Sequence, residues 1–431
     1  MDLVIEARAF FQGKVSDVEI GVDTATGKIV AVKRNIPGQP RKRFRSNHLL
    51  LPSGVDWHVH FSDPGHPAKE DFASGTRAAA HGGIGTVLDM PNTVPLVDRR
   101  SRLREKYETV SAKACIDWGL FATITRETGD PAALAQEAVG AKIYLAPTTG
   151  VSDGPSDDEV RHALEACHEA RRWAVVHAET PPVGASPTNL KAHDESRPSR
   201  LEVDAIRRVA NLAPDPSHVH IAHATTREAL EAAREAGMSA GVTPHHLLLT
   251  YEGRRDASFK VNPPLRPEPD RRGLHDAFAE GLAPHLESDH APHTQDEKKA
   301  RFDETPAGMP GVETLLPLLL RRAKHGDLPL EQVVFASAQR PATALGIPKG
   351  KIEQGFDADF YIVDTRAARK LRADRLHGKC DWSAFEGWPI LPILHHYQRG
   401  VPVIEDGEFT GRAGRGRRID PPPLATTTTA R

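Results

Sequence analysis

The chain has 431 residues, of which 39% are hydrophobic and 26% are charged, so it is long enough for one large globular domain or two smaller ones. Its net charge of −2 argues against a basic nucleic-acid or anionic-membrane binder, and no apolar run reaches the roughly 18 residues that a transmembrane helix needs. Three scattered cysteines exclude a disulfide framework or a cysteine-based zinc site, and the first residues lack a signal-peptide pattern, so we expect a cytoplasmic protein.

Short strand-like segments begin the chain and return near its end. Residues 3–5, 18–22 and 28–32 have this character, with Thr26-Gly27 as a turn before the last of them. The same character returns in three later segments, residues 350–352, 358–364 and 400–404. We therefore expect residues 1–51 and 346–411 to build one small β-sandwich domain together. The segment 412–431 is of low complexity, which predicts a disordered tail.

Between residues 52 and 345 strands alternate with helices. Amphipathic segments such as 69–81, 158–171 and 226–237 are typical of helices, and the last of them ends at Gly237. Eight apolar segments have the length and composition of buried strands, namely 54–61, 83–91, 115–123, 139–146, 172–178, 217–223, 238–243 and 284–289. This alternation favours an α/β fold of the (β/α)₈ TIM-barrel type over an open doubly wound sheet, and no Gly-x-Gly-x-x-Gly follows a strand. The long connection 180–212 has a length typical of functional loops.

The first of these strands carries two histidines on one face. Side chains two residues apart in a strand point the same way, so Asp56, His58 and His60 are expected to align. Two imidazoles at this spacing can bind one metal ion, and Asp56 is placed to hold a ring N–H from behind. A His-x-His pair by itself is a weak signal, because many such pairs are ordinary polar strand positions.

Further ligand types lie at later strand ends, where the catalytic groups of a TIM barrel gather. His220 is the poorer candidate in its strand, because it lies deeper and on the opposite face. Each candidate alone has an ordinary explanation, such as a buried hydrogen-bonded histidine or a turn-capping aspartate. Their joint placement at one barrel mouth instead indicates a metal centre. The candidates are His58 and His60 in the first strand, Lys142 in the fourth, His177 in the fifth, His223 in the sixth and Asp289 in the eighth.

As an ammonium, Lys142 repels metal ions and cannot be a ligand. Carbamylation by CO₂ would turn it into a carboxylate whose two oxygens can bridge two ions. Burial beside cations favours the neutral amine that this reaction needs. Imidazole and carboxylate donors without thiolates suit Zn²⁺, with Mn²⁺ or Co²⁺ as alternatives.

Several longer motifs give the chain a resemblance to a known family. In these motifs it resembles the cyclic amidohydrolases, and among them the dihydroorotases, from about residue 1 to about 410. The matching stretches are Asp-Trp-His-Val-His-Phe (56–61), Asp-Pro-Gly (63–65), Lys-Glu-Asp-Phe (69–72), Met-Pro-Asn-Thr (90–93), Val-Thr-Pro-His-His-Leu (242–247), Val-Asn-Pro-Pro-Leu-Arg (261–266), Ser-Asp-His-Ala-Pro-His (288–293), Gly-Met-Pro-Gly-Val-Glu-Thr (308–314) and Lys-Cys-Asp-Trp-Ser-Ala-Phe-Glu-Gly (379–387).

The resemblance implies a site of two zinc ions. It assigns one ion to His58, His60 and Asp289 and the other to His177 and His223, with carbamylated Lys142 bridging them. Asp289 is then also the expected general base and acid.

The resemblance also implies substrate contacts. Asn92 and His293 match positions that contact substrate, and backbone groups from Gly308 to Gly311 are expected to contact the ring amides. One position departs from the pattern: dihydroorotases usually place an arginine two residues after the second histidine to hold the substrate carboxylate, and here that residue is Ser62. Arg266 is a candidate replacement from its own loop.

The implied reaction is the reversible interconversion of N-carbamoyl-L-aspartate and L-dihydroorotate in pyrimidine biosynthesis. Ser62 keeps an allantoinase- or hydantoinase-type ring-opening enzyme open as an alternative. A weakly active homologue that serves as a partner subunit is a third reading. We expect a small-molecule substrate and a homo-oligomer, with association with another pyrimidine-pathway enzyme as an option and no nucleic-acid or membrane partner.

Overall fold

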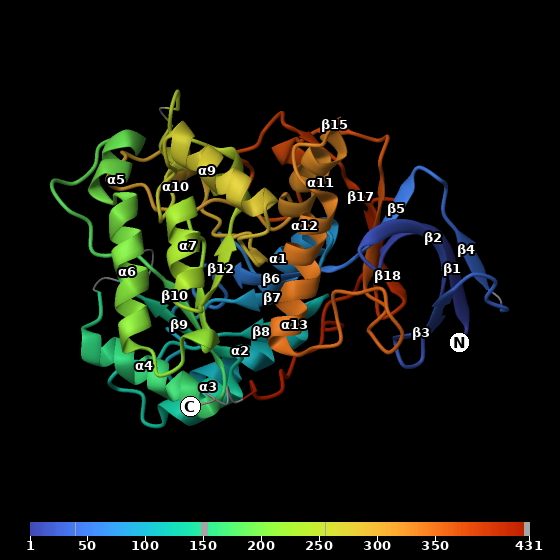
Figure 1. Ribbon diagram of the computed structural model, residues 1–431, viewed down its shortest axis with the longest axis horizontal. Coiled ribbons are helices and arrows are strands. Elements are labelled where there is room, and N and C mark those ends of the chain that lie inside the picture. Colours follow the sequence, from blue (N-terminus) through green and yellow to red (C-terminus); the bar gives the residue numbers. More distant parts are fainter. Residues whose placement is uncertain (39, 148–153, 255, 426–431) are drawn as a thin grey trace.

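The structure is a computed structural model that describes residues 1–38, 40–147, 154–254 and 256–425. A barrel of parallel strands is surrounded by helices, and a curved sheet containing strands from both ends of the chain lies beside it (Figure 1). The predicted fold class is confirmed: an α/β barrel with a small β domain built from both chain ends. In the described ranges no helix is both long and apolar enough to cross a membrane.

Eight parallel strands form the barrel, each within one of the eight segments predicted from the sequence. They are β6 (Gly54–Val59), β7 (Ile84–Asp89), β8 (Asp117–Leu120), β9 (Gly140–Tyr144), β10 (Trp173–His177), β11 (Val219–Ile221), β12 (Ser239–Val242) and β13 (His285–Leu286). The wall consists of two hydrogen-bonded groups, β6 to β8 and β9 to β13. Parallel bridges from Ala122 to Ala141 and from Val59 to His290 connect these groups at both junctions, so the barrel is closed.

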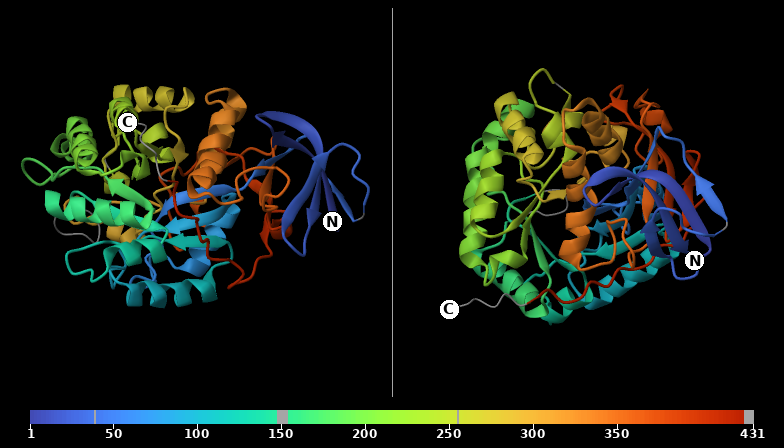
Figure 2. Two further views of the ribbon diagram at one scale, coloured as in Figure 1. Left: turned by 60° about the horizontal axis from the view of Figure 1, so that its bottom comes forward. Right: turned by 45° about the vertical axis from the view of Figure 1, so that its right-hand side comes forward.

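Helices cover the outside of the barrel (Figures 1 and 2). The predicted helices 69–81, 158–171 and 226–237 are present as α1, α4 and α7. Their ends follow from local chemistry: the Asp71 side chain caps α1, Ser156 and Glu159 form a capping box at α4, and Gly237 has φ +75° just after α7. The helices are α1 (Phe72–His81), α2 (Arg100–Lys113), α3 (Pro131–Glu137), α4 (Asp157–Ala170), α5 (Leu190–Ser196), α6 (Ser199–Leu212), α7 (Arg227–Glu235), α8 (Pro244–Leu248), α9 (Glu268–Ala279), α10 (Gln295–Lys298), α11 (Leu315–His325), α12 (Leu330–Val334) and α13 (Arg340–Leu345). Short 3₁₀ helices lie at Pro216–His218, Ala257–Phe259 and Ala373–Arg375, and a π-helical segment, Phe335–Gln339, joins α12 to α13.

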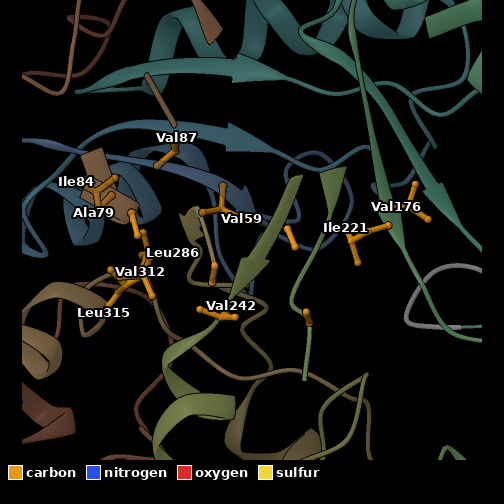
Figure 3. Close-up of a cluster of buried hydrophobic side chains, with 14 of the residues drawn as sticks. Val59, Ala79, Ile84, Val87, Val176, Ile221, Val242, Leu286, Val312 and Leu315 are labelled. Atoms are coloured by element: carbon orange, nitrogen blue, oxygen red, sulfur yellow. The ribbon is translucent and has the colours of Figure 1, made fainter. Parts of the chain in front are cut away.

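The main apolar core lies around the barrel strands. Val87 of β7, Val176 of β10, Ile221 of β11 and Val242 of β12 are fully buried in it, together with Leu315 of α11 (Figure 3). Each such side chain contributes roughly 1.5–3 kcal/mol relative to an exposed position. Parallel strands that are covered on both faces carry apolar residues on both, which explains the continuous apolar runs in the sequence.

Aromatic side chains fill the barrel interior at the level of Trp57. The Trp57 ring packs edge-on against Trp173, with centroids 5.3 Å apart, and against His285 at 4.5 Å. The interior at this level is therefore a packed core rather than a channel, which leaves the carboxyl ends of the strands for a site.

The small β domain contains a nine-stranded sheet with the path β19-β18-β17-β14-β5-β1-β2-β3, on which β4 pairs with β1. The proposed domain boundaries lie near the end of β5, at 51–52, and at the end of α13, at 345–346. The strands are β1 (Leu3–Phe11), β2 (Lys14–Asp23), β3 (Lys28–Lys33), β4 (Arg41–Arg43), β5 (His48–Pro52), β14 (Phe360–Asp364), β17 (Ile393–Gln398), β18 (Val401–Glu405) and β19 (Glu408–Phe409), and β15 (Arg369–Lys370) pairs separately with β16 (Pro389–Ile390).

The expected disorder of residues 412–431 is wrong for 412–425. This segment runs beneath the barrel (Figure 2), and Arg418 forms a parallel bridge to Trp118 of β8. The Arg417 N–H donates to the buried Asp117 carboxylate at 2.8 Å, and the Ile419 side chain is buried. Backbone hydrogen bonds and one apolar anchor thus order a segment whose composition is polar. Residues 426–431 lie outside the described residues.

The connection 180–212 is also more regular than a loop. Helices α5 and α6 occupy most of it. Asp194 of α5 and Glu202 of α6 both pair with Arg266, which ties this region to the loop before α9. Two helices therefore account for most of the length of this connection, which the sequence had suggested to be a functional loop.

Candidate metal centre and substrate pocket

A pocket of about 130 Å³ lies at the carboxyl ends of the barrel strands. All six predicted metal ligands line it, so the structure brings together residues that span more than half the chain. Among the described residues, the lining consists of His58, His60, Ser62, His66, Lys69, Met90, Asn92, Thr93, Val94, Lys142, Tyr144, His177, His223, Asn262, Asp289, Ala291, Pro292, His293, Ala307 and Gly308.

One group of candidate ligands is formed by β6 and the residue after β13. The Nε2 atom of His58 lies 3.4 Å from Oδ1 of Asp289, and the Nε2 atom of His60 lies 3.3 Å from the same oxygen. Donor atoms from these three residues lie within 4.8 Å of one another, close enough to hold one ion. Imidazole nitrogens with a carboxylate oxygen form a donor set suited to zinc.

The second group lies on the neighbouring strands. Nδ1 of His177 is 3.1 Å from Nε2 of His223, and Nζ of Lys142 is 3.3 Å from Nε2 of His58. Lys142 therefore lies at the first group, and the ring of His58 is tilted against that of His223, with centroids 5.0 Å apart. The two groups therefore lie next to each other in one pocket.

Burial disfavours the charged forms of His58, His223 and Lys142. It lowers the pKa of His58 and His223 well below the usual histidine range, with a smaller contribution from the Lys142 charge in each case. Burial also lowers the pKa of Lys142, against the attraction of Glu287 and Asp289. Neutral imidazoles are what a metal ion requires, and a neutral lysine amine is the form that CO₂ modifies. The donor set and its protonation therefore fit a divalent metal centre.

The backbone at this site adopts unusual conformations. His223 has φ +42°, Asp289 has φ +44° and Ser62 has φ +57°, all in the left-handed region that favours glycine. Each such residue costs on the order of 1–3 kcal/mol, and such strain gathers at functional sites. Here it aims two candidate ligands into the pocket.

Three side chains that support the ligands were not predicted from the sequence as such. Glu287 lies 3.4 Å from Nδ1 of His58, and the Glu179 carboxylate accepts a hydrogen bond from Nε2 of His177 at 2.8 Å. Nδ1 of His60 is paired with Oδ1 of Asn92 at 2.7 Å, so Asn92 supports a ligand in addition to lining the pocket. Both acids lie two residues from a ligand in the sequence, which is the only signal that pointed to them.

Asp56 does not hold an imidazole, contrary to the prediction. Its Oδ1 accepts the backbone N–H groups of His58, at 3.1 Å, and of Ser288, at 3.2 Å. The strand pairing is irregular between Asp56 and Val59, so the simple alternation of side chains fails there. Asp56 instead ties β6 to the segment that carries Asp289.

The predicted substrate residues divide into two sets. Ser62, Asn92, His293 and Gly308 line the pocket. Gly311 is not among the described residues that line it, and its N–H donates to Nδ1 of His290 at 3.1 Å.

The prediction that Arg266 replaces the missing arginine is wrong. Arg266 is buried, and its guanidinium donates to Asp194 at 2.7 Å, to Thr225 at 2.8 Å and to Glu202 at 3.3 Å. It does not appear among the pocket-lining residues of the described chain. Its donors are already committed to buried acids, so it braces α5 and α6 rather than a ligand.

Most of the chain is similar to a known protein family. A model of the amidohydrolase family matches residues 49–393. The chain belongs to the amidohydrolase family. Within it, the dihydroorotase of Halobacterium salinarum is 36% identical over 434 residues, covering 96% of this chain and 99% of that protein. The dihydroorotase of Methanosarcina acetivorans is 33% identical over 398 residues, covering 86% and 85%. The predicted membership of the dihydroorotases is thus confirmed.

Solved structures of a dihydropyrimidinase and an L-hydantoinase share the fold of this chain. A dihydropyrimidinase from Brevibacillus agri superposes with a TM-score of 0.89 at 23% identity, covering 99% of this chain and all of that one. An L-hydantoinase from Arthrobacter aurescens gives 0.88 at 25% identity, covering 97% and 99%. The shared fold therefore extends over the barrel and the small β domain together.

Proposed function

We propose that this amidohydrolase is a metal-dependent dihydroorotase, which interconverts N-carbamoyl-L-aspartate and L-dihydroorotate. The observation that carries the proposal is the convergence of six candidate ligands on one pocket, in a chain 36% identical to a dihydroorotase along almost its whole length. An enzyme of this class acts on a small cyclic amide, which fits a pocket of about 130 Å³.

His58, His60 and Asp289 are the proposed ligands of one ion, and His177 and His223 those of the other, with Lys142 as the carbamylated bridge. When bound, two divalent ions supply an activated water near neutral pH and polarise the scissile carbonyl. The nitrogen and oxygen donors favour Zn²⁺, and Mn²⁺ or Co²⁺ suit the same set.

Asp289 is the proposed proton carrier. Its Oδ1 lies within 3.4 Å of two imidazole nitrogens, and the residue lines the pocket, so its carboxylate can meet both the attacking water and the ring nitrogen. In hydrolysis it would accept the proton of the water and deliver it to the leaving nitrogen, and in ring closure it would act in reverse.

Tyr144 is the proposed donor to the developing oxyanion. Its phenol lines the pocket, and its oxygen has no hydrogen-bond partner in the described part of the chain. Burial raises the pKa of Tyr144 well above its usual range, so the phenol keeps its proton and remains a donor. A fixed donor in a buried site stabilises charge that develops on the carbonyl oxygen.

A hydantoinase- or allantoinase-type reaction is the second candidate, and Ser62 is the observation that favours it. A serine at this position cannot form the bidentate contact with a carboxylate that an arginine can. A weakly active partner subunit is a third, weaker candidate, because all six candidate ligands are present.

One experiment separates these candidates. Zinc-loaded protein prepared in bicarbonate is offered dihydroorotate, carbamoyl aspartate, allantoin, hydantoin and dihydrouracil in parallel. Turnover of dihydroorotate and carbamoyl aspartate supports the proposal. Preference for an uncharged ring would contradict it and favour the hydantoinase- or allantoinase-type reaction. No turnover of any of the five compounds, with two ions bound, would favour the partner-subunit candidate.

Three further expectations need their own measurements. Light scattering tests whether the protein is a homo-oligomer, and co-purification tests whether it associates with another pyrimidine enzyme. Cell fractionation tests the cytoplasmic location.

A further inference from the structure

The pocket contains a cation that the metal centre does not use. Lys69 lies just before α1 and lines the pocket, with its side chain largely buried. Its Nζ donates to Nδ1 of His293 at 3.1 Å and lies 2.9 Å from Oε1 of Glu297. Apart from Lys142, it is the only lysine or arginine among the described residues of the lining.

The neighbouring histidine has no ring donor to offer a ligand. Burial, and then the Lys69 charge, lowers the pKa of His293 to about 3, so the ring is neutral. Because Nδ1 accepts from Lys69, the ring proton is on Nε2, which donates to the Ala307 carbonyl at 3.0 Å. Both nitrogens are engaged. An ammonium has three N–H groups, and these two contacts leave Lys69 with one for an incoming anion.

The Glu297 carboxylate, which is not among the described residues of the lining, already pairs with Lys69. Its Oε2 accepts from the N–H of Thr294 at 2.9 Å and caps α10, while Oε1 contacts Lys69. Although partial burial opposes it, the Lys69 contact lowers the pKa of Glu297 to about 2, so the group is a carboxylate. Because this side chain is 36% exposed, solvent weakens its pair with Lys69, and a second carboxylate can compete for the same ammonium.

A carboxylate that enters a mostly buried pocket requires a positive partner, because the loss of its hydration is otherwise not compensated. Dihydroorotate carries such a group on its ring, whereas dihydrouracil has the same ring amides without it. We propose that Lys69 selects the carboxylated ring by binding its carboxylate in competition with Glu297. This inference rests on the proposed function, since it concerns the substrate of that site.

The test compares orotate and uracil, two planar rings that differ only in the carboxylate, by calorimetric titration of the metal-loaded enzyme. Lys69→Met should weaken orotate binding by about 10- to 100-fold and change uracil binding by less than about twofold. Glu297→Gln removes the competitor and should tighten orotate binding by up to about fivefold. Lys299→Met is the matched control, because Lys299 is exposed at the end of α10 and lies outside the lining, so it should change neither ligand.

Equal losses for both ligands in Lys69→Met would show a structural role and overturn the inference, as would unchanged orotate binding. Uracil binding reports whether each variant is folded. If Lys69→Met does not fold, Glu297→Gln still tests the inference, because it should change orotate affinity in the opposite direction, towards tighter binding. Failure of the proposed function has a different signature: the wild-type enzyme would not turn over dihydroorotate, whatever its orotate affinity. With turnover, KM for dihydroorotate should rise in Lys69→Met while kcat is retained.

Discussion

The Glu287 carboxylate lies 3.4 Å from Nδ1 of His58, on the side of the ring away from Asp289. Glu287 is fully buried and is also held by Nε2 of His220. It fits because Gly241 has no side chain: a Cβ there would come within 2.4 Å of the carboxylate. A carboxylate in this place favours the proton on Nδ1 of His58 and leaves the Nε2 lone pair facing the metal centre.

Glu287→Gln is therefore expected to weaken metal binding at the His58 side by about 10- to 100-fold, since partners of metal-bound histidines have effects of this size. The measurement is competition with a chelator, which resolves two affinities. Glu179→Gln is the matched variant, because Glu179 holds His177 in the same way. It should weaken the other ion instead. Equal loss of both ions in both variants would contradict the assignment of one acid to each ion.

Asp289→Asn tests the proton carrier. The amide keeps one oxygen that can contact an ion but cannot accept a proton from water, so we expect turnover to fall by about 10²- to 10⁴-fold. Metal content, measured by elemental analysis, should stay near two ions per chain. Activity near the wild-type level in this variant would assign proton transfer to another group.

Lys142→Ala tests the bridging carbamate. Loss of the side chain should remove activity and most of the bound metal, because a buried anion between the ions is lost. Acetate or propionate, supplied at increasing concentration, should restore part of both by taking the vacant position. The same acids should not rescue Asp289→Asn, which is the control. A complete lack of rescue would argue against a carboxylate-like bridge.

The convergence of the candidate ligands was predictable because strand period and barrel geometry place strand-end side chains together without knowledge of any distant contact. The acids that hold the imidazole rings, Glu287 and Glu179, could not be predicted in the same way. Nothing in the sequence near His58 distinguishes Glu287 from Asp56 as the acid behind its ring, since the choice depends on an irregular pairing after Asp56 and on space left by Gly241. Arg266 was misassigned for a similar reason: its acidic partners lie more than 60 residues earlier in the chain.

Tyr144→Phe tests the oxyanion donor. Removal of one such donor costs about 10²- to 10³-fold in kcat, with little change in KM because the contact strengthens as charge develops. Tyr107→Phe is the control, because its hydroxyl donates to the Glu137 carbonyl away from the pocket. Equal kcat values for the two variants would remove Tyr144 from the mechanism.

Lys349→Met tests how the small β domain is joined to the barrel. Nζ of Lys349 lies 2.7 Å from Asp117 of β8 and 2.6 Å from Asp359, and both carboxylates are buried. Attraction to these acids outweighs burial and raises the pKa of Lys349, so the lysine is charged throughout the neutral range. Its loss removes the cation that these carboxylates share. Arg399 still pairs with Asp117, so the uncompensated charge falls mainly on Asp359 and costs about 3–5 kcal/mol in the free energy of unfolding. Urea denaturation of the metal-loaded enzyme measures this cost.

Lys351→Met is the control for this prediction. It removes a side chain that is 38% exposed and lies 4.0 Å from Glu353, so it should lower the free energy of unfolding by less than about 1 kcal/mol. Similar midpoints for the two variants would mean that the buried cluster does not stabilise the junction.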